Sequence, residues 1–277
     1  MNKKFKRFLI IFVSVCLFLS LLLSFFVIGD KVALGFERFS PDYDKIDLIP
    51  FLTKSELSED DYSVIYKQTG LTKIGVDSTL KRDGISGVLA IQDSVFCEYT
   101  VKSDVFGPFC HYYFLDKRVP MAPLQDGDII VSSSTEFSWW TLGHCAMVVD
   151  AEKGIIVEAV GVGDKSHHAS VSTLYRRGDF MILRPNCDKE TLQNVIDYIE
   201  ESLVGTKYDP TIGVLSRKYD PEIEYTQCAH IFWYAFFKFG INIDSNGGTV
   251  VTPKNIANSK HFDIVQVSGF DFNTLWN

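Results

Sequence analysis

Apolar residues form one unbroken run near the start of the chain. Residues 8–28 hold 21 side chains without a single charge, which is long enough to cross a bilayer as an α-helix. The run is longer than the apolar core of a cleavable signal peptide, and no small-x-small cleavage site follows it. The pattern therefore favours an uncleaved membrane anchor over a cleaved signal.

The charges around this run predict its orientation. Four basic residues precede it, Lys3, Lys4, Lys6 and Arg7, whereas the first 30 residues contain one acid, Asp30. Because basic flanks stay on the cytoplasmic side of a membrane, we expect a single-pass protein of the cell membrane. Everything after residue 30 would then lie outside the cytoplasm.

The stretch from 31 to 120 is less regular, and we interpret it as a linker and an N-terminal extension. Residues 31–50 contain proline and mixed charges without periodicity. Ser58 followed by Asp61 predicts a capped helix that ends at Gly70. A second short helix is predicted over 72–80, and residues 85–120 read as a mixture of helix and loop.

From Met121 onward the pattern is that of an ordered α+β domain, 121–277. Short β-branched or alternating runs predict strands at 129–131, 144–149, 154–160, 180–184 and 262–267. Helices are predicted after Asp188, after Cys228 and after Thr252-Pro253, where each opening carries a capping or helix-starting residue. We therefore expect an antiparallel sheet with helices packed on it.

Charge and cysteine content narrow the function classes. The whole chain carries a net charge of −8 although its first 30 residues are basic, so the body would repel phosphate backbones and no nucleic-acid partner is expected. The six cysteines show no metal-ligand spacing, so we expect no metal and no cofactor. Cys97 and Cys110 are close enough in sequence to form a disulfide, and two free thiols are the alternative.

Cys228 is the candidate nucleophile. It stands where Tyr225-Thr226-Gln227 gives way to an apolar, aromatic helical run. The N-terminus of a helix lowers the pKa of a thiol through its dipole and its free N–H groups. The alternative interpretation is a buried core cysteine, which is the commoner role of a free thiol.

His144 and Glu158 are the candidate base and its orienting carboxylate. If the two predicted strands fold back around Ala151, His144 lies directly opposite Glu158 on one face of the hairpin. Glu158 interrupts an apolar strand, and a charge in such a place needs a partner. The alternative is a hydrogen-bonded histidine and a solvated glutamate at a sheet edge.

Other reactive or aromatic residues have supporting roles or none. Cys145 adjoins His144 but should point to the opposite face of its strand, and we interpret it as structural. His230 is expected to face away from Cys228. Tyr208, Gln227 and Trp140 are predicted to contact substrate, with packing inside its own turn as the equal alternative for Tyr208. Trp139 and Trp140 come just before the His144 strand. Gln227, like the backbone N–H of Cys228, is a candidate oxyanion donor.

Five short motifs carry a resemblance to a known family. They are Gly127-Asp128-Ile129, Gly143-His144, Val157-Glu158-Ala159, Gly205-Thr206-Lys207-Tyr208-Asp209 and Gln227-Cys228. In this order they resemble the circularly permuted branch of the NlpC-type papain-like cysteine hydrolases, the YiiX-like group, over roughly residues 121–270. The departure from the family pattern is Cys145-Ala146-Met147.

The resemblance implies a permuted papain-like fold in which the sheet packs on the nucleophile helix. It also implies that Cys228 is the nucleophile, His144 the general base and acid, and Glu158 the third member. A membrane-anchored cysteine hydrolase that cleaves an amide of cell-wall peptide is then expected. The alternatives are a thiol hydrolase or acyltransferase acting on lipid amides or esters, and a non-catalytic membrane-tethered binding module.

Overall fold

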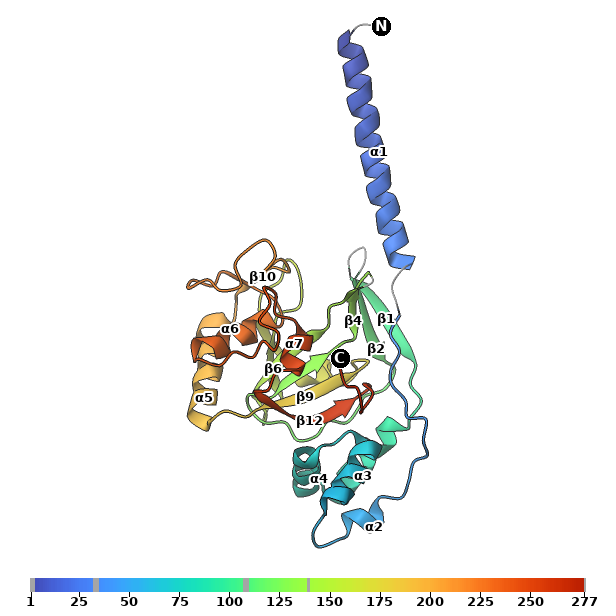
Figure 1. Cartoon of the computed structure of the whole chain (residues 1–277), viewed down its shortest axis with the longest axis vertical. Helices are drawn as coiled ribbons and strands as arrows, with labels where there is room; N and C mark the ends of the chain where they lie inside the picture. Colours follow the sequence, from blue (N-terminus) through green and yellow to red (C-terminus); the bar gives the residue numbers. More distant parts are fainter. Residues whose placement is uncertain (1–2, 32–34, 107–109, 139, 277) are drawn as a thin grey trace.

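The N-terminal helix stands clear of the rest of the protein (Figure 1). The computed structural model describes residues 3–31, 35–106, 110–138 and 140–276, with the backbone alone for 25–31 and 106. Helix α1 (Lys3–Lys31) contains an apolar window of 22 residues, Lys3–Ser24, none of it buried. Such a window rises about 33 Å, against about 30 Å for a hydrocarbon core. The prediction of a helix long and apolar enough to cross a membrane is confirmed, and the side on which the body lies stays a prediction.

A six-stranded antiparallel sheet forms the centre of the body. Its order is β12 (Phe262–Ser268), β9 (Phe180–Pro185), β3 (Ile129–Ser132), β6 (His144–Asp150), β7 (Ile155–Glu158) and β8 (His167–Ser170). The five strands predicted from the sequence all occur in it, and β8 is an addition. The α+β class with an antiparallel sheet is therefore confirmed.

Helices cover both faces of this sheet. On one face pack α5 (Lys189–Tyr198), its π-helical continuation (Ile199–Leu203), α6 (His230–Lys238) and α7 (Pro253–Ala257). On the other pack α2 (Ile49–Leu52), α3 (Glu59–Thr69) and α4 (Lys73–Val95), with a 3-10 turn, Val171–Thr173, at the margin. Strand β6 divides its side chains accordingly, because Cys145 and Met147 face α6 while Ala146 and Val148 face the second core.

A smaller sheet joins the N-terminal extension to the main domain. It consists of β1 (Val101–Phe106), β2 (Cys110–Leu115), β4 (Thr135–Phe137) and β5 (Trp140–Thr141). Helix and loop alone were predicted for 85–120, so β1 and β2 correct that prediction. Strand β2 pairs with β4 across the expected boundary at residue 121, with Cys110 opposite Phe137. The partner of β2 lies far along the chain, and no local pattern announces it.

The predicted helix starts and stops are largely as expected. Ser58 and Asp61 form the reciprocal capping box of α3, which ends at Gly70. Asp188 caps α5, and Thr252 caps α7. Helix α4 is longer than the predicted 72–80, because its second half continues beyond a non-helical residue, Gly84 (φ 66°, ψ −164°).

Residues 35–40, here called the strap, are bound to the body. The Arg38 guanidinium donates to the carbonyl oxygen of Gly178 at 2.6 Å and to Ser268 Oγ at 2.9 Å. The ring of Phe36 stacks on Tyr113 of β2, with centroids 5.5 Å apart. The predicted linker is thus bound to the body in this part.

Candidate active site

His144 opens β6 and its side chain is buried, with 4% of its surface exposed. Its Nε2 lies 2.7 Å from Oε2 of Glu158, which ends β7 and is also buried. The structure thus joins the predicted base to the predicted carboxylate. With Nε2 engaged, Nδ1 is the ring nitrogen left for a second partner.

The predicted register of this hairpin was wrong by two residues. Glu158 lies opposite Ala146, so His144 is its diagonal neighbour. The strands are joined by a four-residue turn, Ala151–Gly154, and a bulge falls between Val148 and Asp150. A shift of two residues leaves every side chain on its original face. The contact therefore survives the error in register.

Cys228 lies at the entrance to α6, between the two-residue parallel pair β10 (Lys207–Tyr208) with β11 (Tyr225–Thr226) and the helix. The α-helix itself begins at His230, two residues later than predicted. The first helical hydrogen bond nevertheless runs from Ile231 N–H to the carbonyl oxygen of Gln227. Cys228 therefore occupies the turn that leads into the positive end of the helix dipole.

Hydrogen bonding and charge prepare the buried pair for ionisation. The neighbouring Cys145 and then His144 lower the pKa of the Cys228 thiol well below its ordinary value, while burial opposes them. Burial alone would lower the pKa of His144, but its interactions with the Cys228 thiol and with Glu158 raise it. A thiol with a lowered pKa beside an imidazole with a raised one favours a thiolate–imidazolium pair.

Glu158 is kept ionised by the same network. Burial would raise the pKa of its carboxyl, but the hydrogen bond and charge of His144 and the charge of Arg177 lower it. An ionised carboxylate on Nε2 fixes the orientation of the imidazole and stabilises its charged form. Glu158 therefore has the position and charge that the role of orienting carboxylate requires.

Arg177 is the residue that sequence reasoning missed. Its side chain is 6% exposed and its guanidinium lies over the rings of Phe114 and Tyr112, 5.2 and 5.6 Å from their centroids. Among the described residues no hydrogen-bond partner is found for Nε or Nη1. Its charge lowers the pKa of both Glu158 and His144, so we interpret it as a positioning residue.

Nothing in the local sequence separates Arg177 from its neighbour Arg176. The Arg176 guanidinium donates to the carbonyl oxygens of Leu115 and Asp116, and no titration shift of the reactive residues depends on it. Only the tertiary fold brings one arginine of the pair beside Glu158 and leaves the other at the surface.

Replacing Arg177 by methionine should move the pH dependence of the reaction. The Arg177 charge lowers the pKa of His144, so its removal raises that pKa. The alkaline limb of kcat/KM, where the imidazolium loses its proton, is then expected at higher pH. Methionine keeps an unbranched chain against Phe114 and Tyr112, and the fold of the variant is checked by thermal unfolding before the pH profile is read. Arg176→Met is the matched control, and an equal shift in both variants would contradict the assignment.

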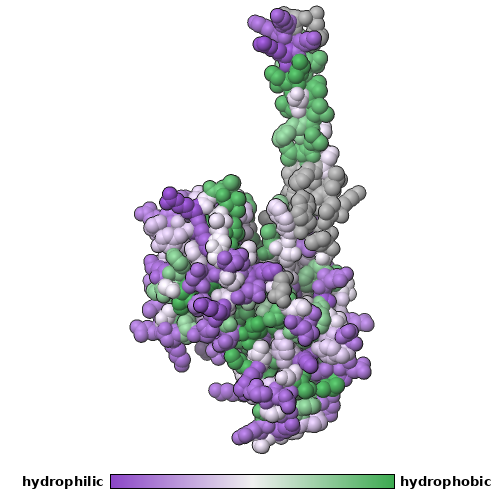
Figure 2. Space-filling model, in the orientation of Figure 1, coloured by the Kyte–Doolittle hydropathy of each residue, from purple (hydrophilic) through white to green (hydrophobic). Residues whose placement is uncertain are grey.

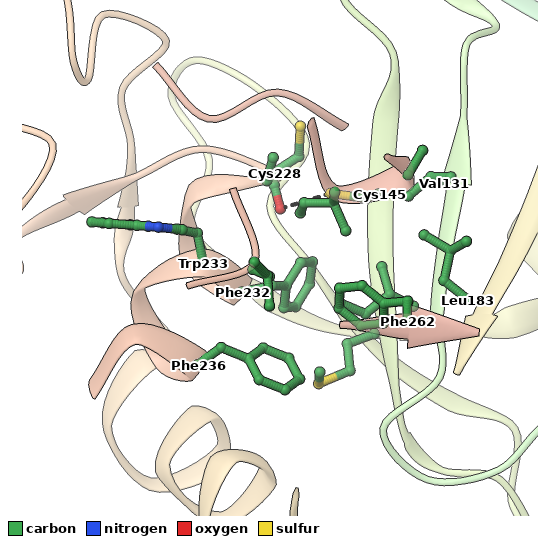
Figure 3. Packing of buried hydrophobic residues seen from close by; sticks show 14 of the residues in the cluster. Val131, Cys145, Leu183, Cys228, Phe232, Trp233, Phe236 and Phe262 are labelled. Atoms are coloured by element: carbon green, nitrogen blue, oxygen red, sulfur yellow. Dashed lines mark hydrogen bonds between the residues drawn. The ribbon is translucent and has the colours of Figure 1, made fainter. Parts of the chain in front are cut away.

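Cys145 and His230 have the structural positions that were predicted for them. The Cys145 thiol is fully buried and donates to the carbonyl oxygen of Cys228 at 3.1 Å (Figure 3). Burial raises its pKa well above the ordinary value, so it stays a thiol. His230 contacts Thr226 Oγ1 and the Lys218 carbonyl oxygen, and burial lowers its pKa to about 4. Cys97 and Cys110 are both free thiols, so they form no disulfide.

Cys228 and His144 open into one cavity of about 390 Å³, a size typical of small-molecule sites. Two of the predicted contact residues, Tyr208 and Gln227, belong to its wall, and so do Cys110 and Tyr112 of the N-terminal extension. Trp140 is 60% exposed and is not part of the wall, although Phe137 opposite it is. Trp139 lies outside the described residues.

The cavity wall is mainly apolar. Its hydrophobic members come from four separate segments, and they include Phe137, Leu142, Val160, Val162, Pro210, Val250, Val251 and Pro253. Among the described residues of the wall, none is an aspartate, glutamate, lysine or arginine. The cavity therefore suits an uncharged, apolar group next to the reactive sulfur.

An oxyanion site is available at the sulfur. Within the described part of the chain, the backbone N–H of Cys228 makes no hydrogen bond, so it is free to donate to a developing oxyanion. The side-chain oxygen of Gln227 accepts from Ala229 N–H at 2.9 Å and from the Cys228 thiol at 3.4 Å. One N–H of its amide donates to the carbonyl oxygen of Val251, which leaves the second for a ligand.

Comparisons of the chain with protein-family models, with curated proteins and with solved structures found no match to any of them.

Proposed function

We propose that this protein is a thiol hydrolase with a circularly permuted papain-like arrangement, in which Cys228, His144 and Glu158 act together. The observation that carries the proposal is that His144, hydrogen-bonded to Glu158, lines one cavity together with Cys228. The pKa of the thiol is lowered and that of the imidazole raised. A buried structural cysteine would need neither change.

The reaction follows from this arrangement. His144 takes the proton of Cys228 through Nδ1, and the thiolate attacks the substrate carbonyl carbon to form a tetrahedral oxyanion beside the Cys228 N–H. The C–N or C–O bond then breaks as the imidazolium protonates the leaving group, which leaves a thioester. Water, deprotonated by His144, attacks the thioester, and the carboxylic acid and the free thiol are released.

The substrate that the cavity favours is an acyl group of a lipid amide or ester. A cell-wall peptide, the other candidate, carries carboxylates and amines, and the described cavity wall offers no aspartate, glutamate, lysine or arginine to pair with them. An alkyl chain needs only apolar contacts, which this wall supplies. The apolar helix α1 would keep such an enzyme at a membrane.

Alkylation of Cys228 tests the reactive pair without knowledge of the substrate. At pH 6 an ordinary thiol is less than about 1% ionised, so Cys228 should react with iodoacetamide at least about tenfold faster than half-buried Cys187, whose pKa burial raises. Peptide mapping of the full chain in detergent separates the two sites. His144→Ala should remove the difference, and equal rates in the unaltered protein would favour a non-catalytic module.

Incubation with two substrate classes tests the proposed substrate. The full chain is offered long-chain lipid amides and esters in one arm and purified muropeptides in the other, with Cys228→Ser as the control in both. Release of fatty acid that depends on Cys228 is the expected result. Cleavage of muropeptides alone would assign the site to cell-wall peptide.

A further inference from the structure

Apolar side chains project into solvent around the mouth of the cavity. Val162 is 67% exposed, and Val214 and Leu215, between β10 and β11, are 69% and 81% exposed. Phe137 and Leu142 are also more than one-third exposed. These five residues are called the apolar rim. Figure 2 shows apolar surface at the top of the left lobe of the body, across a gap from the foot of α1, where Figure 1 places the segment around β10.

Hydrogen bonds and a tight backbone contact fix the turn that carries Val214 and Leu215. Val214 and Leu215 N–H both donate to the carbonyl oxygen of Thr211, and Asp209 accepts from the N–H and hydroxyl of Thr211. Gly213 has φ +84°, and a Cβ there would lie 2.0 Å from the Thr249 carbonyl oxygen. These contacts fix a turn that points two large apolar side chains outward. Exposed apolar patches of this kind usually mark a site of interaction.

The rim continues into the cavity. Phe137, Leu142 and Val162 are exposed on their outer side and also line the cavity that contains Cys228. Val250, in the segment on which Gly213 rests, lines the same cavity. An apolar chain entering from outside would therefore meet apolar surface along its path to the sulfur.

The attachment of α1 places this end of the body close to a membrane. Phe36 follows the last residue of α1 by five positions, which span at most about 18 Å of extended chain. The ring of Phe36 stacks on Tyr113, the neighbour of the cavity residue Tyr112. Helices α2 and α3 lie at the opposite end of the body (Figure 1). A helix that crosses a bilayer thus leaves the rim at its surface.

We propose that the apolar rim docks into the surface of the membrane that holds α1, and that an acyl chain of a bilayer lipid enters the cavity through it. The lipid part of this inference rests on the proposed hydrolase function, whereas the docking does not. Exposed Arg217, two residues after Leu215, is in reach of lipid phosphates.

Depth-dependent fluorescence quenching tests the docking directly. The full chain is reconstituted in phosphatidylcholine vesicles with or without bromine on the upper acyl chain, and tryptophan is introduced by Leu215→Trp. Ile49→Trp, in α2 at the opposite end and 48% exposed, is the matched control. Bromine should quench the added fluorescence of Leu215→Trp at least twofold more. Equal quenching of the two variants would mean that residue 215 stays in solvent, and it would overturn docking. If the tryptophan at position 215 becomes more buried as the protein density in the vesicles rises, but is not quenched by bromine, the rim contacts a second copy of the chain and docking is again overturned.

A second arm separates docking from catalysis. The double variant Val214→Asp/Leu215→Asp should hydrolyse a long-chain acyl lipid in vesicles at least about tenfold more slowly than the unaltered protein. Its rate of iodoacetamide labelling at Cys228 should be unchanged, which reports an intact fold and reactive pair. If Cys228 of the unaltered protein is labelled no faster than Cys187, the proposed hydrolase function is contradicted but the docking is not. Unchanged vesicle turnover in the double variant would contradict the role of the rim.

Discussion

Replacing His144 by alanine is expected to lower kcat/KM for a fluorogenic palmitoyl ester by about 10² to 10⁴-fold, the contribution of a positioned general base and acid. The imidazole is buried, is oriented by Glu158 at 2.7 Å and lines the same cavity as Cys228, whose thiol raises the pKa of His144. Without it the thiol loses an interaction that lowers its pKa, and the leaving group loses its proton donor. Both half-reactions of acyl transfer should slow.

The pattern of variants distinguishes this role from a structural one. His168→Ala removes an exposed imidazole that pairs with Glu200 at 2.8 Å, and its kcat/KM should stay within about twofold of the unaltered protein. The decisive comparison is with Cys228→Ser. If serine abolishes activity while His144→Ala retains more than about a tenth of it, another group must deprotonate Cys228 and the proposed pair is wrong.

The side-chain alternation of β6 was the most useful information in the sequence for placing the site. It put His144 and Glu158 on one face and Cys145 on the other, and this depends only on both segments being paired strands. The register depended on the turn between them, whose four residues and adjacent bulge have no strong sequence signature. The face on which a side chain lies was therefore easier to predict than the register, because a shift of two residues leaves every side chain on the same face.

The cavity wall was less predictable because it is assembled from distant segments. Cys110 and Tyr112 reach it through the pairing of β2 with β4, and a mixed aromatic run gives no local sign of that partner. Arg177 lies beside Glu158 for the same kind of reason. Trp140 lies only four residues before His144, yet it is 60% exposed and is not part of the wall. Nearness in sequence was a poor guide to nearness in the site.

Truncating Phe236 should have the largest effect on stability among substitutions outside the site. Its ring is 1% exposed and meets Phe262 of β12 edge-on, with centroids 5.8 Å apart, between α6 and the central sheet (Figure 3). Phe236→Ala leaves a cavity at this junction, and such changes cost about 3–5 kcal/mol of unfolding free energy. For a domain of this size the Tm should fall by about 10 °C. Thermal unfolding of the full chain in detergent, followed by intrinsic fluorescence, measures it.

Phe237→Ala is the matched control, since it makes the same chemical change on the same helix. Phe237 is 40% exposed and its main contacts are the rings of Trp233 and Tyr219, so its loss should cost only about 1 kcal/mol. Equal shifts in Tm would mean that α6 is not held to the sheet through Phe236. Because α6 begins two residues after Cys228, a loosened helix should also let the thiol drift from His144. Phe236→Ala should therefore lose the rapid alkylation of Cys228 at lower temperature than Phe237→Ala does, and this links the packing of the aromatic helix to the reactivity of the sulfur.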